Sequence, residues 1–282
     1  MQFTRQQVVT RLRSEIERRQ AIVCAGAGTG IFAKFIERGG ADLIIVYNSG
    51  RFRMAGIGSN AGTLPLGDAN AIMMDMGERE ILPVVRDVPV IAGVNGTDPT
   101  RHMPRFLERV LDVGFAGVIN FPTMGIIDGR WRQSLEETGF SYALEVDMIA
   151  AAGALGLYTM AYTFNDEEVR QMASVGVDVV VAHLGTTVGG LIGADPANTP
   201  SLDDAVQRTQ QMADVARAEH PGAIVLTHGG PIATPAEVRE VLARTSAQGF
   251  VGASTMERLP VEQAIGDTVR AFKDVPLQGD AG

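Results

Sequence analysis

The sequence predicts an α/β barrel in which eight strand–helix units follow one another along the chain. First, short apolar runs alternate eight times with amphipathic segments, which implies parallel strands joined by right-handed crossovers. Second, the 282 residues suit a closed barrel, which typically takes about 250 residues. Third, 45% of the residues are hydrophobic but only 6% are aromatic, as parallel strands covered by helices require. An open doubly wound sheet is the alternative, but closure fits the count and length better.

An additional helix is expected before the first strand. Thr4 and Gln7 have the spacing of a capping box, and Val8, Leu12 and Ile16 recur at helical spacing. We expect this helix to plug one end of the barrel. The predicted single domain divides into this helix (1–20), the barrel (21–273) and a C-terminal tail (274–282).

The strands are predicted where four to seven mostly apolar residues run into small or polar ones. Gly39, Gly114, Gly156 and Gly176 lie between a helix and the next strand, where a left-handed cap favours glycine. In chain order the predicted strands are 21–26, 42–47, 88–94, 116–121, 157–162, 177–183, 223–228 and 249–254.

A helix is predicted after each strand, with long loops inserted after the second and fourth strands. Asn165 with Glu168 and Thr234 with Glu237 have capping-box spacing, and Pro235 lies where a first-turn proline is tolerated. The predicted helices span about 31–38, 68–80, 104–112, 142–154, 166–174, 202–218, 235–245 and 261–272.

Composition excludes several functional classes. The net charge of −9 argues against a nucleic-acid or anionic membrane partner. A single cysteine, Cys24, excludes an intramolecular disulfide framework and a cysteine-based zinc cage. The first residues lack the apolar core of a secretory signal, and the longest uncharged stretch, 148–165, contains glycines and is too short for a typical membrane span. We therefore expect a soluble cytoplasmic protein.

Two histidines are the sharpest candidates for catalysis. His183 and His228 each end an apolar strand, and the two strands are sequential. Catalytic groups of such barrels come from the C-terminal strand ends, and adjacent strands lie roughly 5 Å apart. A neutral imidazole can give or take a proton near pH 7. The alternative is that each ring only hydrogen-bonds a loop carbonyl.

An anion site is expected after the last two strands. Gly229-Gly230 and Gly252-Ala253-Ser254 stand where barrels of this kind usually bind phosphate, because glycine lets an anion approach the backbone closely. A carboxylate would fit as well, and tight turns are the alternative.

Other strand ends give weaker signals. Arg51 and Arg53 are expected to clamp a carboxylate, or else to be solvated. Gly28 lies in a glycine-rich turn that lacks the acidic residue of a dinucleotide site after the second strand. The two lysines, Lys34 and Lys273, fall on predicted helices, so a Schiff-base mechanism is not expected.

Several segments together resemble the phosphoenolpyruvate hydrolase-like family, whose members are TIM barrels similar in fold to indole-glycerol-phosphate synthase. The resemblance covers about 25–272. The segments that carry it are GAGTGIFAKFIERGGADLIIVYNSGRFRMAG, GDANAI, AGVNGTDP, NFPTMGIIDGRWRQSLEETG, VVAHLGTTVGG, HGGPIATP and GASTMERLPVE.

A more distant resemblance reaches the isocitrate lyase and phosphoenolpyruvate mutase superfamily. There a Tyr-x-Ser-Gly segment holds a 2-oxo-carboxylate, which Tyr47-Asn48-Ser49-Gly50 matches. An Asp-x-Asp pair that holds magnesium follows strand three, where this chain has Gly93-Val94-Asn95. The resemblance thus implies a small anionic oxo-acid ligand and leaves Mg²⁺ or another divalent metal open as cofactor. Barrels of that superfamily often assemble, so we expect a homo-oligomer.

The leading hypothesis is an enzyme that cleaves a C–C or C–P bond, or hydrolyses an enol phosphate, in a small 2-oxo-acid-like substrate. A ligand-sensing or partner-binding barrel without turnover is the alternative. An enzyme like indole-glycerol-phosphate synthase is less favoured, because strand-end lysines are missing. The predicted catalytic residues are His183 and His228 as proton carriers, Asn48 and Asn120 for an enolate oxygen, and Asp98 and Glu257 as reserve acid–base or metal ligands. The predicted substrate-binding residues are Gly28, Tyr47, Ser49, Gly50, Arg53, Asn95 (also considered for the enolate oxygen), Thr123, Gly229, Gly230, Gly252, Ala253 and Ser254.

Overall fold

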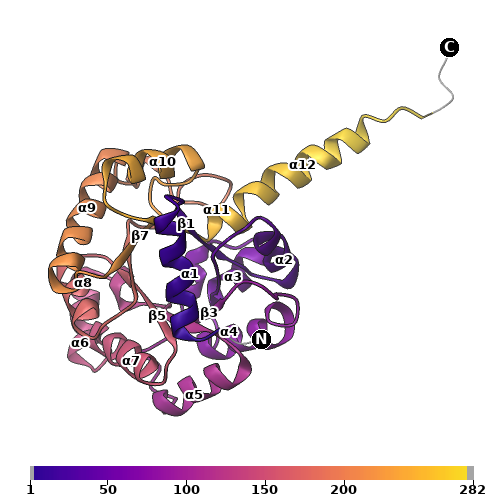
Figure 1. The fold of residues 1–282 in the computed structure, drawn as a ribbon. Coiled ribbons are helices and arrows are strands. Elements are labelled where there is room, and N and C mark those ends of the chain that lie inside the picture. The colour runs from indigo at the N-terminus through magenta and orange to yellow at the C-terminus, as the bar shows by residue number, and fades with distance from the viewer. Residues whose placement is uncertain (1–2, 278–282) are drawn as a thin grey trace.

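A computed structural model, which describes residues 3–277, confirms the predicted fold class. Eight parallel strands follow one another in chain order, and β1 pairs with β8 to close a TIM-type barrel (Figure 1). The strands are β1 Ile22–Gly26, β2 Leu43–Val46, β3 Val90–Val94, β4 Gly117–Asn120, β5 Tyr158–Thr163, β6 Val179–His183, β7 Ile224–His228 and β8 Gly249–Gly252.

Helices surround the barrel near the predicted positions. They are α2 Gly30–Arg38, α4 Ala69–Met76 with its π-helical continuation Gly77–Ile81, α5 Met103–Val113, α7 Tyr142–Ala154, α8 Asp166–Ser174, α9 Leu202–Glu219 and α10 Pro235–Arg244.

Two segments predicted as loops contain helices, α3 Asn48–Met54 and α6 Gly129–Glu137. Helix α3 lacks a side-chain cap at Tyr47, and α6 has no buried apolar face. Caps and apolar faces are the signals used to predict helices from sequence, so these two helices were missed. The loops that follow the strands also contain short helical segments. These are the 3₁₀ segments Ser59–Thr63, Met124–Ile126 and Pro196–Asn198, and the one-turn helix α11 Ser254–Glu257.

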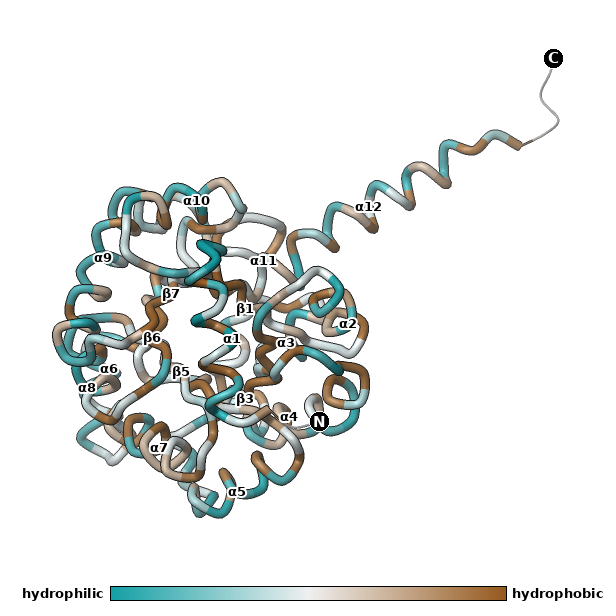
Figure 2. The backbone as a smooth tube through the Cα atoms, viewed as in Figure 1, coloured by the Kyte–Doolittle hydropathy of each residue, from teal (hydrophilic) through white to brown (hydrophobic). Residues whose placement is uncertain are grey.

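Side chains fill the interior of the barrel, so it is a packed core and not a channel. Inward-facing strand residues such as Cys24, Ile45, Met160, Val181 and Leu226 form one cluster of buried side chains. A second cluster lies between the strands and the surrounding helices. Figure 2 shows the apolar strands within a ring of helices of mixed polarity. Full burial of each large aliphatic side chain contributes roughly 1.5–3 kcal/mol.

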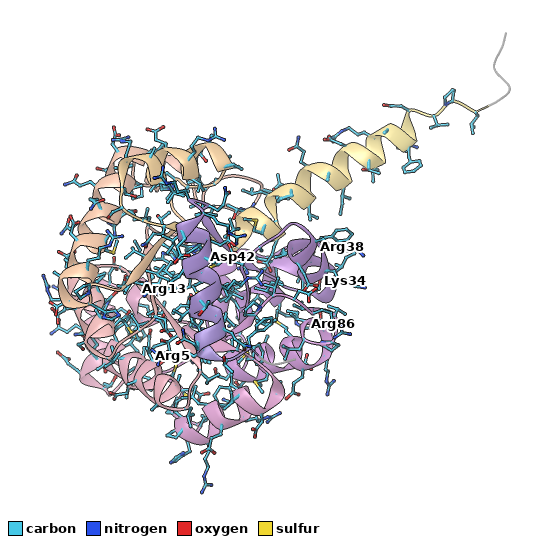
Figure 3. All side chains as sticks on the ribbon, viewed as in Figure 1. Arg5, Arg13, Lys34, Arg38, Asp42 and Arg86 are labelled. Atoms are coloured by element: carbon cyan, nitrogen blue, oxygen red, sulfur yellow. The ribbon has the colours of Figure 1, made fainter. Side chains whose placement is uncertain are left out.

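Helix α1 (Arg5–Glu17) crosses the N-terminal ends of the strands, as Figures 1 and 3 show. Val8 and Leu12 are fully buried and belong to the interior cluster. Arg5 forms an ion pair of 2.9 Å with Asp178, just before β6. Because this end is plugged, a ligand has to enter at the C-terminal ends of the strands.

The last helix does not take its predicted place. Helix α12 (Leu259–Lys273) forms where a helix was predicted, but it projects away from the barrel and buries none of its residues (Figure 1). Its apolar residues Ile265, Val269 and Phe272 are 61%, 55% and 76% exposed. Residues 261–272 were predicted as the last helix of the barrel, but most of this apolar stripe is uncovered within residues 3–277. No helix in that range is long and apolar enough to cross a membrane.

Candidate active site

A small cavity opens at the C-terminal ends of the strands; the empty space within and above it is about 460 Å³, part of which is open solvent. Seven predicted site residues line it, together with side chains from the loops after β2, β4 and β6. The lining residues are Tyr47, Ser49, Arg53, Ser59, Asn60, Phe121, Ile126, Tyr162, His183, Gly185, Thr186, Thr187, His228, Ala253 and Ser254.

The two strand-end histidines lie side by side in this cavity. His183 and His228 are paired in the register of β6 and β7, and their ring centroids are 4.6 Å apart. Both are buried. One small ligand can therefore contact both rings.

Hydrogen bonds assign the two imidazoles opposite roles. Nδ1 of His228 lies 2.6 Å from the carbonyl oxygen of Val251; since a carbonyl only accepts, this Nδ1 carries the proton and Nε2 has a lone pair. Nδ1 of His183 accepts the N–H of Gly185 at 3.1 Å, so the proton of the neutral ring is on Nε2. His228 thus offers an acceptor and His183 a donor.

Both rings stay neutral at pH 7. Burial, reinforced by the nearby charge of Arg53, lowers the pKa of His228 to about 4. Burial also lowers the pKa of His183 well below its usual value, and His228 adds to this effect. A neutral His228 can accept a proton at Nε2, whereas a neutral His183 can donate a hydrogen bond.

Tyr162 is a cavity residue that the sequence reasoning missed. Its ring centroid lies 4.9 Å from that of His183 and 5.0 Å from that of His228, and its hydroxyl is 2.6 Å from the hydroxyl of Tyr47. One hydroxyl donates to the other, which leaves one O–H for a ligand. The signal was present, because Tyr162 continues the inward alternation of Tyr158 and Met160 along β5.

Arg53 places a fixed positive charge in the cavity wall. Helix α3 starts directly after β2, so Ser49 and Arg53, four residues apart, share one face. The guanidinium pairs with Glu257 through Nε, while Nη1 donates to Ser49 at 2.9 Å and to Ser59 at 3.1 Å. Arg51, the other half of the expected clamp, instead pairs with surface carboxylates.

Three further predicted residues support Arg53 and do not line the cavity. Glu257 is fully buried against the guanidinium. A β-carbon at Gly28 would lie 2.9 Å from Oε1 of Glu257, and one at Gly50 would lie 3.3 Å from it. These glycines are therefore needed for close packing. The Asn48 side chain is also engaged, since Nδ2 donates to the carbonyl of Gly62 at 2.8 Å.

The glycine turns after β7 and β8 do not reach the cavity. Gly229 and Gly230 have φ values of 75° and 57°, and the N–H of Gly230 donates to the carbonyl of Gly185 at 2.9 Å. A β-carbon at Gly252 would lie 2.4 Å from Oγ1 of Thr255. The tight-turn alternative describes these glycines, whereas Ala253 and Ser254 do line the cavity.

Residues predicted after β3 form a separate network outside the cavity. Asp98 accepts hydrogen bonds from Thr100 and Asn70 and pairs with Arg101. Burial raises the pKa of Asp98, but these contacts outweigh burial and lower it to about 2. Oδ1 of Asn95 accepts from Thr97 at 2.9 Å. Neither Asp98 nor Asn95 is brought to the histidines.

Residues predicted after β4 lie behind the cavity and hold Tyr162. Oδ1 of Asn120 accepts the N–H of Tyr162 at 2.7 Å, and its Nδ2 donates to Glu145 at 2.7 Å. Glu145 also accepts from Thr123 at 2.7 Å and from the N–H of Met124 at 2.5 Å. Asn120 and Thr123 are therefore fixed by a buried carboxylate that was assigned no role from the sequence.

The grouping of metal-ligating side chains among the described residues bears on whether a metal could bind. Within 3–277, no three His, Cys, Asp or Glu side chains are grouped closely enough to hold a metal ion. Asp98, Glu145 and Glu257, three of the carboxylates at this end, each bind different protein partners.

Comparison with known proteins identifies the family. The profile of the phosphoenolpyruvate hydrolase-like family matches residues 7–275, so the chain belongs to that family, as the resemblance predicted. It is 54% identical to the ToMV resistance protein Tm-1(GCR237) of Solanum lycopersicum over 96% of this chain and 36% of that protein. It is 35% identical to the putative transcriptional regulatory protein y4pA of Sinorhizobium fredii (strain NBRC 101917 / NGR234), over 96% and 44%. The chain thus spans less than half of either relative.

Solved structures with this fold come from the predicted superfamily. Phosphoenolpyruvate phosphomutase from Streptomyces platensis subsp. rosaceus matches with a TM-score of 0.63 and 19% identity, over 94% of this chain and 87% of that one. Phosphonopyruvate hydrolase in complex with oxalate and Mg²⁺ gives 0.58 and 15%, over 95% and 87%. Oxaloacetate acetylhydrolase gives 0.62 and 17%, over 99% and 90%. At these identities the likeness shows a shared fold.

Proposed function

We propose that the protein is an enzyme that cleaves a C–C or C–P bond, or hydrolyses an enol phosphate, in a small anionic 2-oxo-acid-like substrate. The observation that carries this proposal is the pair of neutral imidazoles with opposite hydrogen-bonding character in one small cavity beside a buried guanidinium. Proton transfer needs an acceptor, and a developing oxyanion needs a donor.

Each group of cavity residues has a distinct role in the proposed reaction. Arg53 and Ser49 bind the carboxylate or phosphate, with Ser254 next to Ser59 on the same wall, where their hydroxyls are 3.2 Å apart. Nε2–H of His183 donates to the oxo or enolate oxygen. Nε2 of His228 takes the proton from the substrate or from attacking water.

The comparisons support the substrate class. One solved structure of this fold is a hydrolase bound to oxalate, and others act, by their names, on phosphoenolpyruvate or oxaloacetate. Oxalate, oxaloacetate and phosphoenolpyruvate all place a carboxylate beside a second oxygen function. An anion with that pattern can contact Arg53 and His183 together.

The test is turnover followed by ³¹P and ¹H NMR with phosphoenolpyruvate, phosphonopyruvate and oxaloacetate as separate substrates. We expect the protein to convert at least one, and His228→Asn to lower kcat about 10²–10⁴-fold. Asparagine keeps a donor for Val251 but no basic nitrogen. His220→Asn, at the exposed end of α9, is the matched control. No conversion of any substrate, or an unchanged rate in His228→Asn, would reject the proposal.

A non-catalytic barrel is the second candidate. Curated relatives are named a resistance protein and a putative transcriptional regulatory protein, and neither name describes an enzyme. Tight binding of one small anion without any product in the NMR assay would favour this candidate.

We further propose that two copies of the chain exchange α12. Val23 of β1 is the one residue of the eight described strands that is only partly buried, and it lies in an apolar groove with Phe32, Phe35 and Ile36 of α2. Pro260, Val261 and Ile265 of α12 also line this groove, but beyond them the helix projects away from the barrel. An α12 from a second copy would cover the groove with its unpartnered stripe, and the exchange is reciprocal in a two-fold dimer.

Size-exclusion chromatography with light scattering tests the exchange. We expect the mass of a dimer for the protein and of a monomer for Phe272→Asp, which puts a charge on the stripe. Trp131→Asp, an exposed apolar site on α6, is the control and should stay dimeric. A monomeric parent protein, or a dimeric Phe272→Asp variant, would contradict the exchange.

A further inference from the structure

We infer that this barrel binds its anionic ligand through the guanidinium of Arg53 without a divalent metal, in contrast to the neighbour that was crystallised with oxalate and Mg²⁺. The inference rests on the proposed function for the class of ligand. It adds the source of the positive charge and assigns Glu257 as the residue that positions Arg53.

The end of β3 leaves no room for the carboxylate pair that holds magnesium in the superfamily this chain resembles. The corresponding residues are Gly93, Val94 and Asn95. A β-carbon at Gly93 would lie 3.0 Å from Cδ1 of Tyr47 and 3.0 Å from the carbonyl oxygen of Val46. The Tyr47 ring thus occupies the space that an acidic side chain would need, so the departure from the Asp-x-Asp pattern is steric as well as chemical.

The carboxylates that remain cannot converge on one ion. Asp98 and Glu145 belong to separate networks, described above, that do not line the cavity. Glu257 is buried with Arg53; its second oxygen, Oε1, has no hydrogen-bond partner within 3–277 and is enclosed by Gly28 and Gly50. A cation beside Glu257 would also have to lie next to a guanidinium.

Arg53 can supply the positive charge that a bound metal ion would otherwise provide. Its side chain is 1% exposed, yet it lines the cavity. Nε and Nη1 are held by Glu257, Ser49 and Ser59, whereas Nη2 is buried and has no hydrogen-bond partner within 3–277. A buried N–H without a partner costs free energy that a ligand oxygen recovers, and a fixed guanidinium matches the geometry of a carboxylate or phosphate.

Glu257 keeps this group in place. Its carboxylate accepts from Nε and leaves Nη2 without a hydrogen-bond partner within 3–277. Glycines at 28 and 50 permit this approach. Without Glu257, Arg53 would lose its anchor and its charge would have no buried counter-ion, which is strongly destabilising.

The decisive experiment is isothermal titration calorimetry of the unmodified, metal-stripped protein with oxalate as the probe, once with EDTA and once with millimolar MgCl₂. We expect dissociation constants that agree within about twofold, whereas an obligatory metal bridge would weaken binding by well over tenfold in EDTA. Oxalate binding only with Mg²⁺ would overturn the inference and leave the proposed function standing. No binding of oxalate in either buffer would reject both, because the class of ligand would then be wrong.

Variants locate the charge. Arg53→Met should weaken oxalate binding roughly 10- to 100-fold, as expected for loss of hydrogen bonds to a charged group. Arg51→Met, on the same helix but outside the cavity, should bind like the parent protein. Circular dichroism and thermal melting establish that each variant is folded, and Arg53→Met/Glu257→Leu removes both buried charges if the single variant unfolds. Parent-like affinity in a folded variant without Arg53 would also overturn the inference.

Discussion

Replacement of Glu145 by glutamine should change how the free energy of unfolding depends on pH. Burial raises the pKa of Glu145 to about 7 from the usual 4.5, although Met124, Thr123 and Asn120 donate hydrogen bonds to it. Between these two values the folded protein binds a proton that the unfolded chain has released. The stability contributed by this group is therefore fully present below pH 4.5 and falls as the pH rises through 7.

The magnitude follows from the size of the shift. A difference of about 2.5 pKa units corresponds to about 3.4 kcal/mol, and integration from pH 5 to pH 8 gives a loss of about 2.5 kcal/mol. Glutamine does not titrate, so this part of the pH dependence should be absent in Glu145→Gln. A constant offset is also expected, because the glutamine N–H₂ would face the N–H₂ of Asn120.

The assay is urea unfolding at pH 5 and at pH 8 for the parent protein and the variant. The difference between their unfolding free energies should shift by about 2.5 kcal/mol between the two pH values, in favour of the variant at pH 8. Asp147→Asn, on the exposed face of the same helix, is the control and should follow the parent within about 0.5 kcal/mol. An identical pH dependence in Glu145→Gln and the parent would refute the reasoning.

Two further predictions concern the cavity and its packing. If His228 is the base, log(kcat/KM) measured from pH 3.5 to 8 should decline only below an apparent pKa near 4, where the imidazole of His228 becomes protonated. A decline near pH 6.5 would mean that burial does not set the pKa of His228. Gly28→Ala should destabilise the fold by about 1–3 kcal/mol in urea unfolding, since its β-carbon would lie 2.6 Å from Cγ of Met54 and 2.8 Å from the carbonyl oxygen of Gly50. Gly266→Ala on exposed α12, where the nearest atom is 3.6 Å away, should not destabilise, and equal effects at the two positions would contradict the packing argument.

The fold could be predicted because its signals are local and repeated. Each strand is a short apolar run followed by a capped helix, and the eight repeats fix the topology through the handedness of the crossovers. Helix α12 also has a local signal, and its boundaries were predicted within two residues. Its departure from the barrel could not be predicted, because an apolar stripe indicates that a helix is covered and not which chain covers it.

The residues that line the candidate site could be predicted only in part, because several residue types serve both chemistry and packing. His183 and His228 were found since polar residues at sequential strand ends must converge. Gly28 and Gly50 were assigned to ligand binding, yet the same absence of a β-carbon serves a buried ion pair. Tyr162 was overlooked because a tyrosine within an apolar strand is usually a core residue.

The charges of the side chains around the cavity are balanced in a way that favours the binding of an anion. Arg53 and Glu257 neutralise each other, and burial keeps both histidines uncharged, so these four side chains carry no net charge between them. An anion that binds near Arg53 offsets one of the two influences that lower the pKa of His228, since an opposite charge within a few ångströms favours the protonated ring. In the proposed mechanism, binding would therefore make His228 a stronger base than it is in the free protein, when a substrate proton is within reach. In the proposed mechanism, the charge of Arg53, which helps to make His228 a weak base in the free protein, couples the basicity of His228 to the binding of substrate.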